Sequence, residues 1–255
     1  MAKNTQKKQE TDGNTADSHL LFAPERRVIG ADAARRMAER CSEYNDSRSE
    51  CRDFNCVEIR GVNFSEEDLS GVEAHYGKFT DCEFVGCKFN RMEAQFAEFE
   101  NCTFKNCELE NAQFPFVKMT DVVFFNSNLD GADFPFAQGN FSCTGCMMSR
   151  CTAQNAALHL VLSAVNAGGF EANSAHLELD VTDSNFRCGE FNDGVIRGRI
   201  VRTDLTRAEL NRSDLTELEL ADCASSGMET EDATGLDNSL DDDLSDLFDD
   251  EDEDE

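Results

Sequence analysis

Cysteine and histidine are the residues of this chain that could bind a metal or support catalysis. The sequence has 12 cysteines and 4 histidines. Cys143 and Cys146 form a Cys-x-x-Cys pair, the spacing with which many zinc sites begin, but no second pair and no paired histidine follows. The four histidines lie in unrelated positions of the sequence pattern, and no nucleophile can be matched with a neighbouring base. We therefore expect a protein that is not an enzyme and that has no metal or cofactor.

Four further cysteines, Cys82, Cys87, Cys102 and Cys107, are separated by multiples of five residues. An even number of cysteines can indicate disulfides. These four, however, stand where a five-residue pattern has small side chains, and buried cysteine behaves as a small hydrophobic residue. We expect them to be free thiols that pack in a core, in a reducing cytoplasm.

The pattern that places these cysteines is a five-residue repeat. From Phe54 to Phe134, fifteen of the seventeen positions that are five residues apart are large and apolar. Neither a helix nor a strand has this period. The segment Phe114-Pro115-Phe116 recurs twenty residues later, which indicates that four repeats make one structural unit. The sequence predicts a four-sided coil whose turns stack like parallel strands, about 4.8 Å apart.

This pattern resembles the pentapeptide-repeat family, whose consensus is a small residue, Asp or Asn, Leu or Phe, a polar residue and any residue. The resemblance covers about residues 52–222. It implies an all-β solenoid, a right-handed quadrilateral parallel β-helix, to which we add a short N-terminal helix and disordered ends. Members of this family have many roles, so the resemblance predicts the fold more specifically than the function.

The distribution of charge and periodicity predicts four segments. A polar leader over 1–30 and an acidic tail over 226–255, which has 15 acids and no base, are expected to be disordered. Residues 31–50 should form a capping helix, at about 32–44, and a linker. Residues 51–225 should form the β-helix. Within it the five-residue phase fades over 141–178, where distorted coils and a short helical insertion are both open, and we favour coils.

The net charge of −29 excludes several classes of function. It argues against nucleic-acid binding by phosphate neutralisation and against docking on an anionic membrane. No apolar run is long enough to span a membrane, and no apolar segment follows the N-terminal lysines as in a secretory signal. We expect a cytoplasmic protein encoded by a bacterium or phage, with a secreted effector as the alternative.

Three groups of residues are candidates for binding a protein partner. The first is an outer aromatic ladder that could mediate self-association or could be covered by the capping helix or a corner. The second is an acidic column beside it, which also includes Gln113 and whose acids could instead bond the turn backbone. The third is a tail with helical spacing, which could dock in a partner's groove or only solubilise the protein. In order, the three groups are Tyr76, Phe96, Phe116 and Phe136; Asp53, Glu73, Glu93 and Asp133; and Leu240, Leu244, Leu247 and Phe248.

The leading hypothesis is an acidic DNA mimic. Residues 51–225 have 28 acids and 14 bases. Spread over the expected coils, this excess is about one charge per ~3 Å, roughly half the density of duplex DNA. The resemblance implies a role like that of pentapeptide-repeat proteins that protect or inhibit DNA gyrase. The expected partner is a protein with a basic DNA-binding surface, such as a type II topoisomerase. The alternative is a rigid scaffold, with a homodimer as one of its forms.

Overall fold

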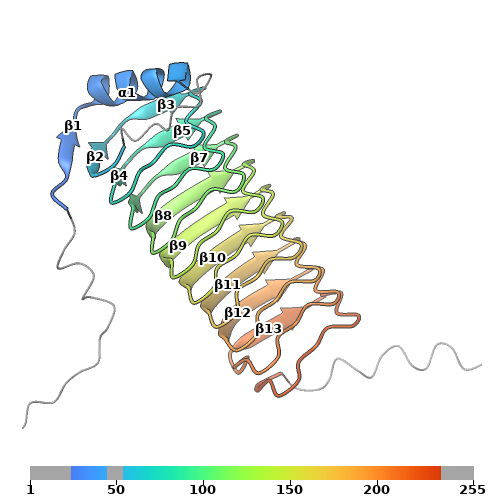
Figure 1. Cartoon of the computed structure of the whole chain (residues 1–255). Coiled ribbons are helices and arrows are strands. Elements are labelled where there is room, and N and C mark those ends of the chain that lie inside the picture. Colours follow the sequence, from blue (N-terminus) through green and yellow to red (C-terminus); the bar gives the residue numbers. More distant parts are fainter. Residues whose placement is uncertain (1–23, 45–53, 237–255) are drawn as a thin grey trace, which may run out of the picture.

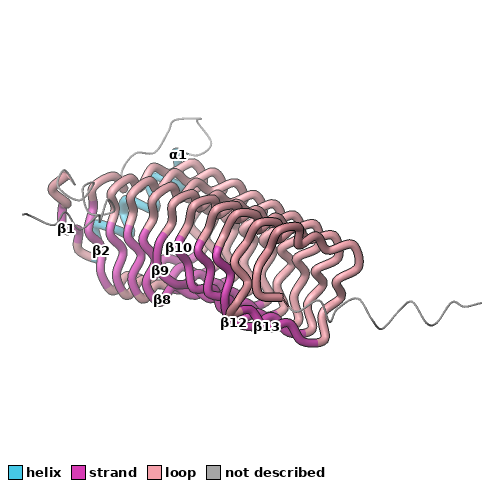
Figure 2. Tube along the Cα trace, turned by 90° about the horizontal axis from the view of Figure 1, so that it is seen from below, coloured by secondary structure: helices cyan, strands magenta, loops and turns pink. Residues whose placement is uncertain are grey.

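The computed structural model describes residues 24–44 and 54–236, which form a parallel β-solenoid with one helix across its first coil (Figure 1). Every strand pairing is parallel, and the strands follow one another along the solenoid in chain order. Strands gather along one side, while turns make up the other sides (Figure 2). The elements are β1 (Arg27–Ile29), α1 (Ala31–Tyr44), β2 (Val57–Arg60), β3 (Asn63–Ser65), β4 (Lys78–Thr80), β5 (Glu83–Val85), β6 (Glu98–Glu100), β7 (Thr103–Lys105), β8 (Lys118–Phe125), β9 (Gln138–Thr144), β10 (Ala157–Ser163), β11 (His176–Thr182), β12 (Val195–Val201) and β13 (Leu218–Ala221).

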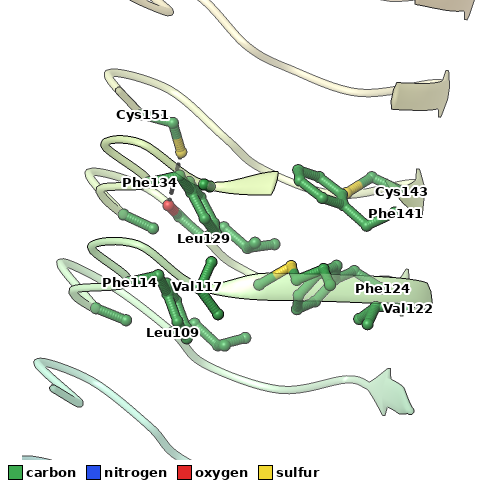
Figure 3. Packing of buried hydrophobic residues seen from close by; sticks show 14 of the residues in the cluster. Leu109, Phe114, Val117, Val122, Phe124, Leu129, Phe134, Phe141, Cys143 and Cys151 are labelled. Carbon is green, nitrogen blue, oxygen red and sulfur yellow. Dashed lines mark hydrogen bonds between the residues drawn. The ribbon is translucent and has the colours of Figure 1, made fainter. Parts of the chain in front are cut away.

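The large residues of the five-residue repeat fill the interior, as predicted. Their neighbours in adjacent coils are twenty residues away, so identical side chains lie above one another. The rings of Phe64, Phe84, Phe104 and Phe124 stack with centroids 5.0, 4.7 and 4.9 Å apart. Figure 3 shows how the next columns, which contain Leu109 and Leu129, pack beside them. The core is therefore a set of parallel side-chain columns.

The coil turns at corners where the backbone is left-handed. In the second coil these corners are Tyr76, Asp81, Gly86 and Arg91, with φ between 54° and 64°. At the first of them Gly77 N donates to the carbonyl of Ala74 over 3.0 Å and closes a tight turn. Such a turn requires positive φ at its third residue, which favours Gly or Asn.

The coils become one residue shorter after Met119. Lys118 pairs with Gln138, twenty residues on, but Val122 pairs with Phe141, nineteen residues on. Nineteen-residue spacing then continues through β10 and β11. Two short strands and the corner between them are replaced by one straight seven-residue strand, in which buried and exposed residues alternate. The segment 141–178, all of which is described, thus forms coils, and the apparent irregularity is this shortening.

The N-terminal end of the solenoid differs from the predicted boundary. The helix expected at 32–44 is present as α1, and its apolar residues Ala34, Met37 and Ala38 are buried. The sequence predicts a disordered leader up to residue 30, but Arg27–Ile29 forms β1 and pairs with β2. Its backbone satisfies the open edge of the first coil.

At the other end the coils continue past residue 225, where the sequence predicts the start of the tail. A bridge between Asp214 and Thr234 extends the ladder into the last described turn. This bridge is made by backbone groups, which need no repeat consensus in the side chains. In the part of the chain that the structure describes, no helix has the length and apolar character to cross a membrane.

Candidate interaction surfaces

The predicted aromatic ladder lies at a corner of the solenoid. We call Tyr76, Phe96, Phe116 and Phe136 the aromatic corner. Their rings stack with centroids 5.0, 5.0 and 4.8 Å apart and interplanar angles of 18°, 19° and 5°. The first three are half-buried, and Phe136 is 45% exposed. The sequence therefore predicted this stack correctly. Its position at a corner is one of the alternatives that the sequence left open.

The backbone of the aromatic corner is strained. All four residues have φ of 57° or 58°. Left-handed backbone costs about 1–2 kcal/mol for a residue other than glycine, and Asn and Asp tolerate it best. In later coils this corner has Asn155, Ser174 and Asp193 instead. Stacking returns about 0.5–1.5 kcal/mol per aromatic pair, so the aromatics at best offset their own strain. A strained, partly exposed aromatic stack is a candidate binding surface.

The chain enters the solenoid beside this corner. Arg27 N donates to the carbonyl of Cys56, which has the corner position of the first coil. Arg26 Nε donates to the carbonyl of Tyr76 over 2.8 Å, and Arg26 Nη2 forms a 2.7 Å ion pair with Glu98. Burial alone would raise the pKa of the Glu98 carboxyl, but Arg26 and Lys78 outweigh it and hold this pKa below its ordinary value. A charged anchor therefore lies at the N-terminal end of the aromatic corner.

Helix α1 lies across the N-terminal end of the solenoid, next to β3 (Figure 1). There Ser42 Oγ donates to the Glu67 carboxylate over 3.0 Å and accepts from Asp68 N over 2.8 Å. The expectation that α1 might cover the aromatic ladder is wrong.

The acidic column runs beside the aromatic corner and is longer than predicted. Glu73, Glu93, Gln113 and Asp133 are bridged from coil to coil. Asp53 lies outside the described residues. The same ladder continues through Thr152 and four more acids. A search of the sequence at twenty-residue spacing does not find these acids. From here on, the acidic column means Glu73, Glu93, Asp133, Glu171, Glu190, Glu209 and Glu229.

Amide side chains support the C-terminal half of the acidic column. The donors are Asn173 to Glu190 over 3.2 Å, Asn192 to Glu209 over 3.2 Å and Asn211 to Glu229 over 3.5 Å. The amides are themselves aligned, because each of their oxygens accepts from the backbone of the next coil. An amide satisfies a carboxylate's hydrogen bonding without cancelling its charge. The arrangement orders the carboxylates and leaves these positions negative.

Several other faces pair opposite charges. Lys78 Nζ is 3.4 Å from Glu98, in a register column where Glu58, Lys78, Glu98 and Lys118 alternate in charge. Arg202 makes two contacts of 2.6 and 2.9 Å with Asp183 and lowers the pKa of that carboxyl by hydrogen bonding. Amide support also occurs outside the acidic column, where Asn90 donates to Glu108 over 3.2 Å and Asn140 donates to Asp121 over 2.8 Å.

The cysteines are mainly core residues. Cys82, Cys87, Cys102 and Cys107 are free and buried, as predicted. Cys143 and Cys146 are buried too, and among the described residues no group of three or more potential ligands could hold a metal. Cys41, in α1, is disulfide-bonded, which the sequence analysis did not predict.

We expect thiol titration at pH 7 to separate Cys188 from the core cysteines. Cys188 is exposed, whereas burial raises the pKa of the Cys107 and Cys151 thiols to about 12. Core thiols should react at least about 100-fold more slowly, since they must wait for local opening. Cys188→Ser should remove the fastest phase. Rapid reaction of Cys107 or Cys151 in the folded protein would contradict this packing.

The histidines show one further departure from the sequence analysis. His159 and His176 lie together in an open hollow on the outer face of β10–β12, with Glu178 and Arg197. His176 pairs with Ala157 in parallel register, two residues before His159 on the same strand. The lining of this hollow includes neither serine nor cysteine. The tail residues Leu240, Leu244, Leu247 and Phe248 lie outside the described residues.

Comparisons with known proteins agree with the repeat. The family model for pentapeptide repeats matches residues 97–135 with eight copies. No curated protein sequence matches the chain. Among solved structures, a trypsin-treated form of the plasmid-mediated fluoroquinolone resistance protein QnrB1 has 19% identity and a TM-score of 0.42, with 75% of this chain and 89% of that chain covered. HetL of the cyanobacterium Nostoc sp., involved in heterocyst differentiation regulation, has 13% identity and a TM-score of 0.32, with 75% and 91% covered. The family match therefore shows pentapeptide repeats at residues 97–135, and the chain folds as the parallel β-solenoid that these repeats predict.

Proposed function

We propose that this protein is a non-catalytic binding protein whose acidic column occupies a basic, DNA-binding surface of another protein. The acidic column carries the proposal. It presents carboxylates in seven of nine successive coils, about 4.8 Å apart, where one DNA strand presents a phosphate about every 3.4 Å. The amides beside it hold the carboxylates in place before binding, which lowers the cost of ordering them on a partner.

The net charge of −29 adds a long-range attraction to any basic partner and should speed encounter. A type II topoisomerase such as DNA gyrase is the partner that this chemistry favours, because its DNA-binding surface must be basic and elongated. Direct contact with nucleic acid is not part of the proposal, since like charges repel.

The test is competition between this protein and labelled duplex DNA for purified DNA gyrase. The variant Glu171→Gln/Glu190→Gln/Glu209→Gln keeps the shape of the acidic column and removes three charges. We expect its competition to be weaker by roughly tenfold, at a few tenths to 1 kcal/mol per charge pair. Raising the salt concentration should weaken the wild-type protein more than the variant.

A matched control removes three charges elsewhere. Glu83, Glu217 and Glu219 pair with Lys105, Arg197 and Arg199 on other faces. The triple Gln variant of these residues should compete almost as well as the wild-type protein. Equal losses in the two triple variants would assign the effect to net charge alone. Absence of any salt-sensitive competition with DNA would refute the proposal for gyrase.

A second candidate function is a scaffold that assembles through the aromatic corner, as a homodimer or with a partner, and recruits others through its acidic tail. The strained stack of four rings favours it. Phe96→Ser and Phe116→Ser should then reduce the mass measured by light scattering, whereas the Gln variants should not. If the acidic column is the functional surface, the variant Glu171→Gln/Glu190→Gln/Glu209→Gln should compete with DNA less well than the wild-type protein. Phe96→Ser and Phe116→Ser should then affect this competition less.

A further inference from the structure

Gly168 and Gly169 are the only two adjacent glycines in the sequence, and they lie at a corner of the solenoid. The backbone of Gly169 is left-handed, with φ of 68°, which favours glycine. Gly168 has no such φ, and a Cβ atom there would meet nothing closer than 3.8 Å. The adjacent coils have Ser149 and Arg187 at its position. Neither backbone conformation nor packing therefore explains why residue 168 is a glycine.

The backbone N–H of Gly168 differs from its equivalents in having no acceptor. In the next coil Arg187 N donates to Oδ1 of Asn185, two residues before it, over 2.9 Å. The equivalent oxygen for Gly168 is Oδ1 of Asn166, which accepts instead from Asn185 Nδ2. Within residues 24–44 and 54–236, the Gly168 N–H makes no hydrogen bond. Because its equivalent donates to a surface side chain, we infer that this N–H is directed outward.

Further hydrogen-bond donors lie on both sides of Gly168. Arg150 N donates to the Gly168 carbonyl over 3.0 Å, and Gly169 N donates to the Arg187 carbonyl over 2.9 Å, so an arginine stands in each adjacent coil. The Arg150 side chain extends over Gly169, because its Cγ lies 3.7 Å from where a Cβ of Gly169 would be. Both arginines are exposed, and neither forms an ion pair with a described residue. Ser149 adds a hydroxyl in the same column.

The acidic column does not neutralise this corner. In the three coils concerned it has Thr152, Glu171 and Glu190. Glu190 accepts from Asn173, which follows the acidic column in the chain and so lies on its far side from Gly169. The bridged column on the other side of the corner is uncharged and consists of Met147, Asn166 and Asn185. The two arginines thus exceed the single carboxylate, that of Glu171, for which the described residues supply no amide donor.

We propose that the Gly168 N–H, the Ser149 hydroxyl and the side chains of Arg150 and Arg187 form a binding site for one oxyanion group of the phosphate type. Arginine matches a phosphate with two parallel hydrogen bonds, and the N–H and hydroxyl supply two more donors. Glycine at 168 leaves the N–H uncovered, which gives that residue a reason. The net charge of −29 repels long polyanions, so the site favours a single small group. The proposal is independent of the acidic column's partner.

The test is a titration of the ¹⁵N-labelled full-length protein with inorganic phosphate, followed by ¹H–¹⁵N correlation spectra. Sodium chloride at the same ionic strength is the reference. We expect the Gly168 amide signal to shift in a saturable manner with phosphate and not with chloride. Gly168→Glu identifies that signal by its loss, and this variant should no longer bind phosphate. Its fold should be retained, because Glu110 has the same position in an earlier coil.

Two double variants separate the site from net charge. Arg150→Gln/Arg187→Gln should weaken phosphate binding by at least about tenfold, the cost of losing hydrogen bonds to a charged group. Arg202→Gln/Arg212→Gln removes the same charge at other corners, where these arginines pair with Asp183 and Asp193, and should bind almost as the wild-type protein does. Circular dichroism verifies that each variant keeps its coils.

A phosphoserine peptide and its unphosphorylated form distinguish the source of the group. Tighter binding of the phosphoserine peptide than of inorganic phosphate would assign the site to a phosphorylated partner, and equal binding to a free oxyanion. Either result supports the site. Equal weakening in the two arginine variants would overturn it in favour of a general charge effect. A Gly168 signal that responds to phosphate no more than to chloride would overturn it outright.

Discussion

We expect Phe124→Ala to lower the free energy of unfolding by about 3–5 kcal/mol, the range for removing a buried phenylalanine. Phe124 is fully buried, stacks on Phe104 at 4.9 Å and meets Phe141 edge-on at 5.7 Å. The cavity would interrupt a column of rings, and each coil is stabilised only by its two neighbours, so the loss cannot be shared more widely. Urea unfolding followed by circular dichroism measures the change.

The next residue is the matched control. Phe125 has the same side chain on the same strand, but it points outward and is 42% exposed. Phe125→Ala should change the free energy of unfolding by less than about 1 kcal/mol. Similar losses for the two variants would mean that the alternation of buried and exposed residues along β8 is wrong.

This contrast between neighbours is what the sequence predicts best. A period of five places every large residue of the phase on the inside, and the twenty-residue recurrence of Phe114-Pro115-Phe116 sets the coil length. Those two numbers are sufficient to derive the stacked interior rings and the aromatic corner. The fold can be predicted because every coil packs its side chains in the same way. Dozens of residues therefore indicate the same coil geometry.

The same counting fails where the geometry changes. After Met119 the coils are nineteen rather than twenty residues long. A column that is followed in steps of twenty therefore drifts out of register. Glu171, Glu190 and Glu209 were missed for this reason, although their own spacing of nineteen was a detectable signal. The recurrence of Leu158 and Leu177 at the same spacing was another.

Strand β1 and the last described turn could not be predicted from side chains. The side chains of Arg27 and Val28 are exposed and carry no periodicity. Their segment is held by backbone hydrogen bonds to an open coil edge, such as that from Arg27 N to Cys56. Any residue except proline can donate such bonds. The identity of the residues in this segment therefore does not predict that they form.

The change in coil length also predicts an essential glycine. Gly139 pairs with Met119 immediately before the register shifts, and its φ is 113°. A Cβ atom there would overlap the Met119 carbonyl oxygen, which is fixed by the ladder. Gly139→Ala therefore combines backbone strain with a clash that no side-chain rotation relieves, and we expect it to lower the free energy of unfolding by about 3 kcal/mol or more. Urea unfolding is again the measurement.

Gly61→Ala separates the two contributions. Gly61 has φ of 62°, and no atom lies within 4 Å of where its Cβ would be, so only the left-handed backbone cost of about 1–2 kcal/mol applies. Equal losses at Gly61 and Gly139 would show that close approach to Met119 is not the constraint. Gly198 tests generality, because it lies where the twenty-residue spacing returns and its Cβ would overlap the Leu179 carbonyl. A large loss at both Gly139 and Gly198 would mean that the solenoid needs glycine wherever its coil length changes, because there one coil's backbone must come closer to its neighbour than a side chain permits.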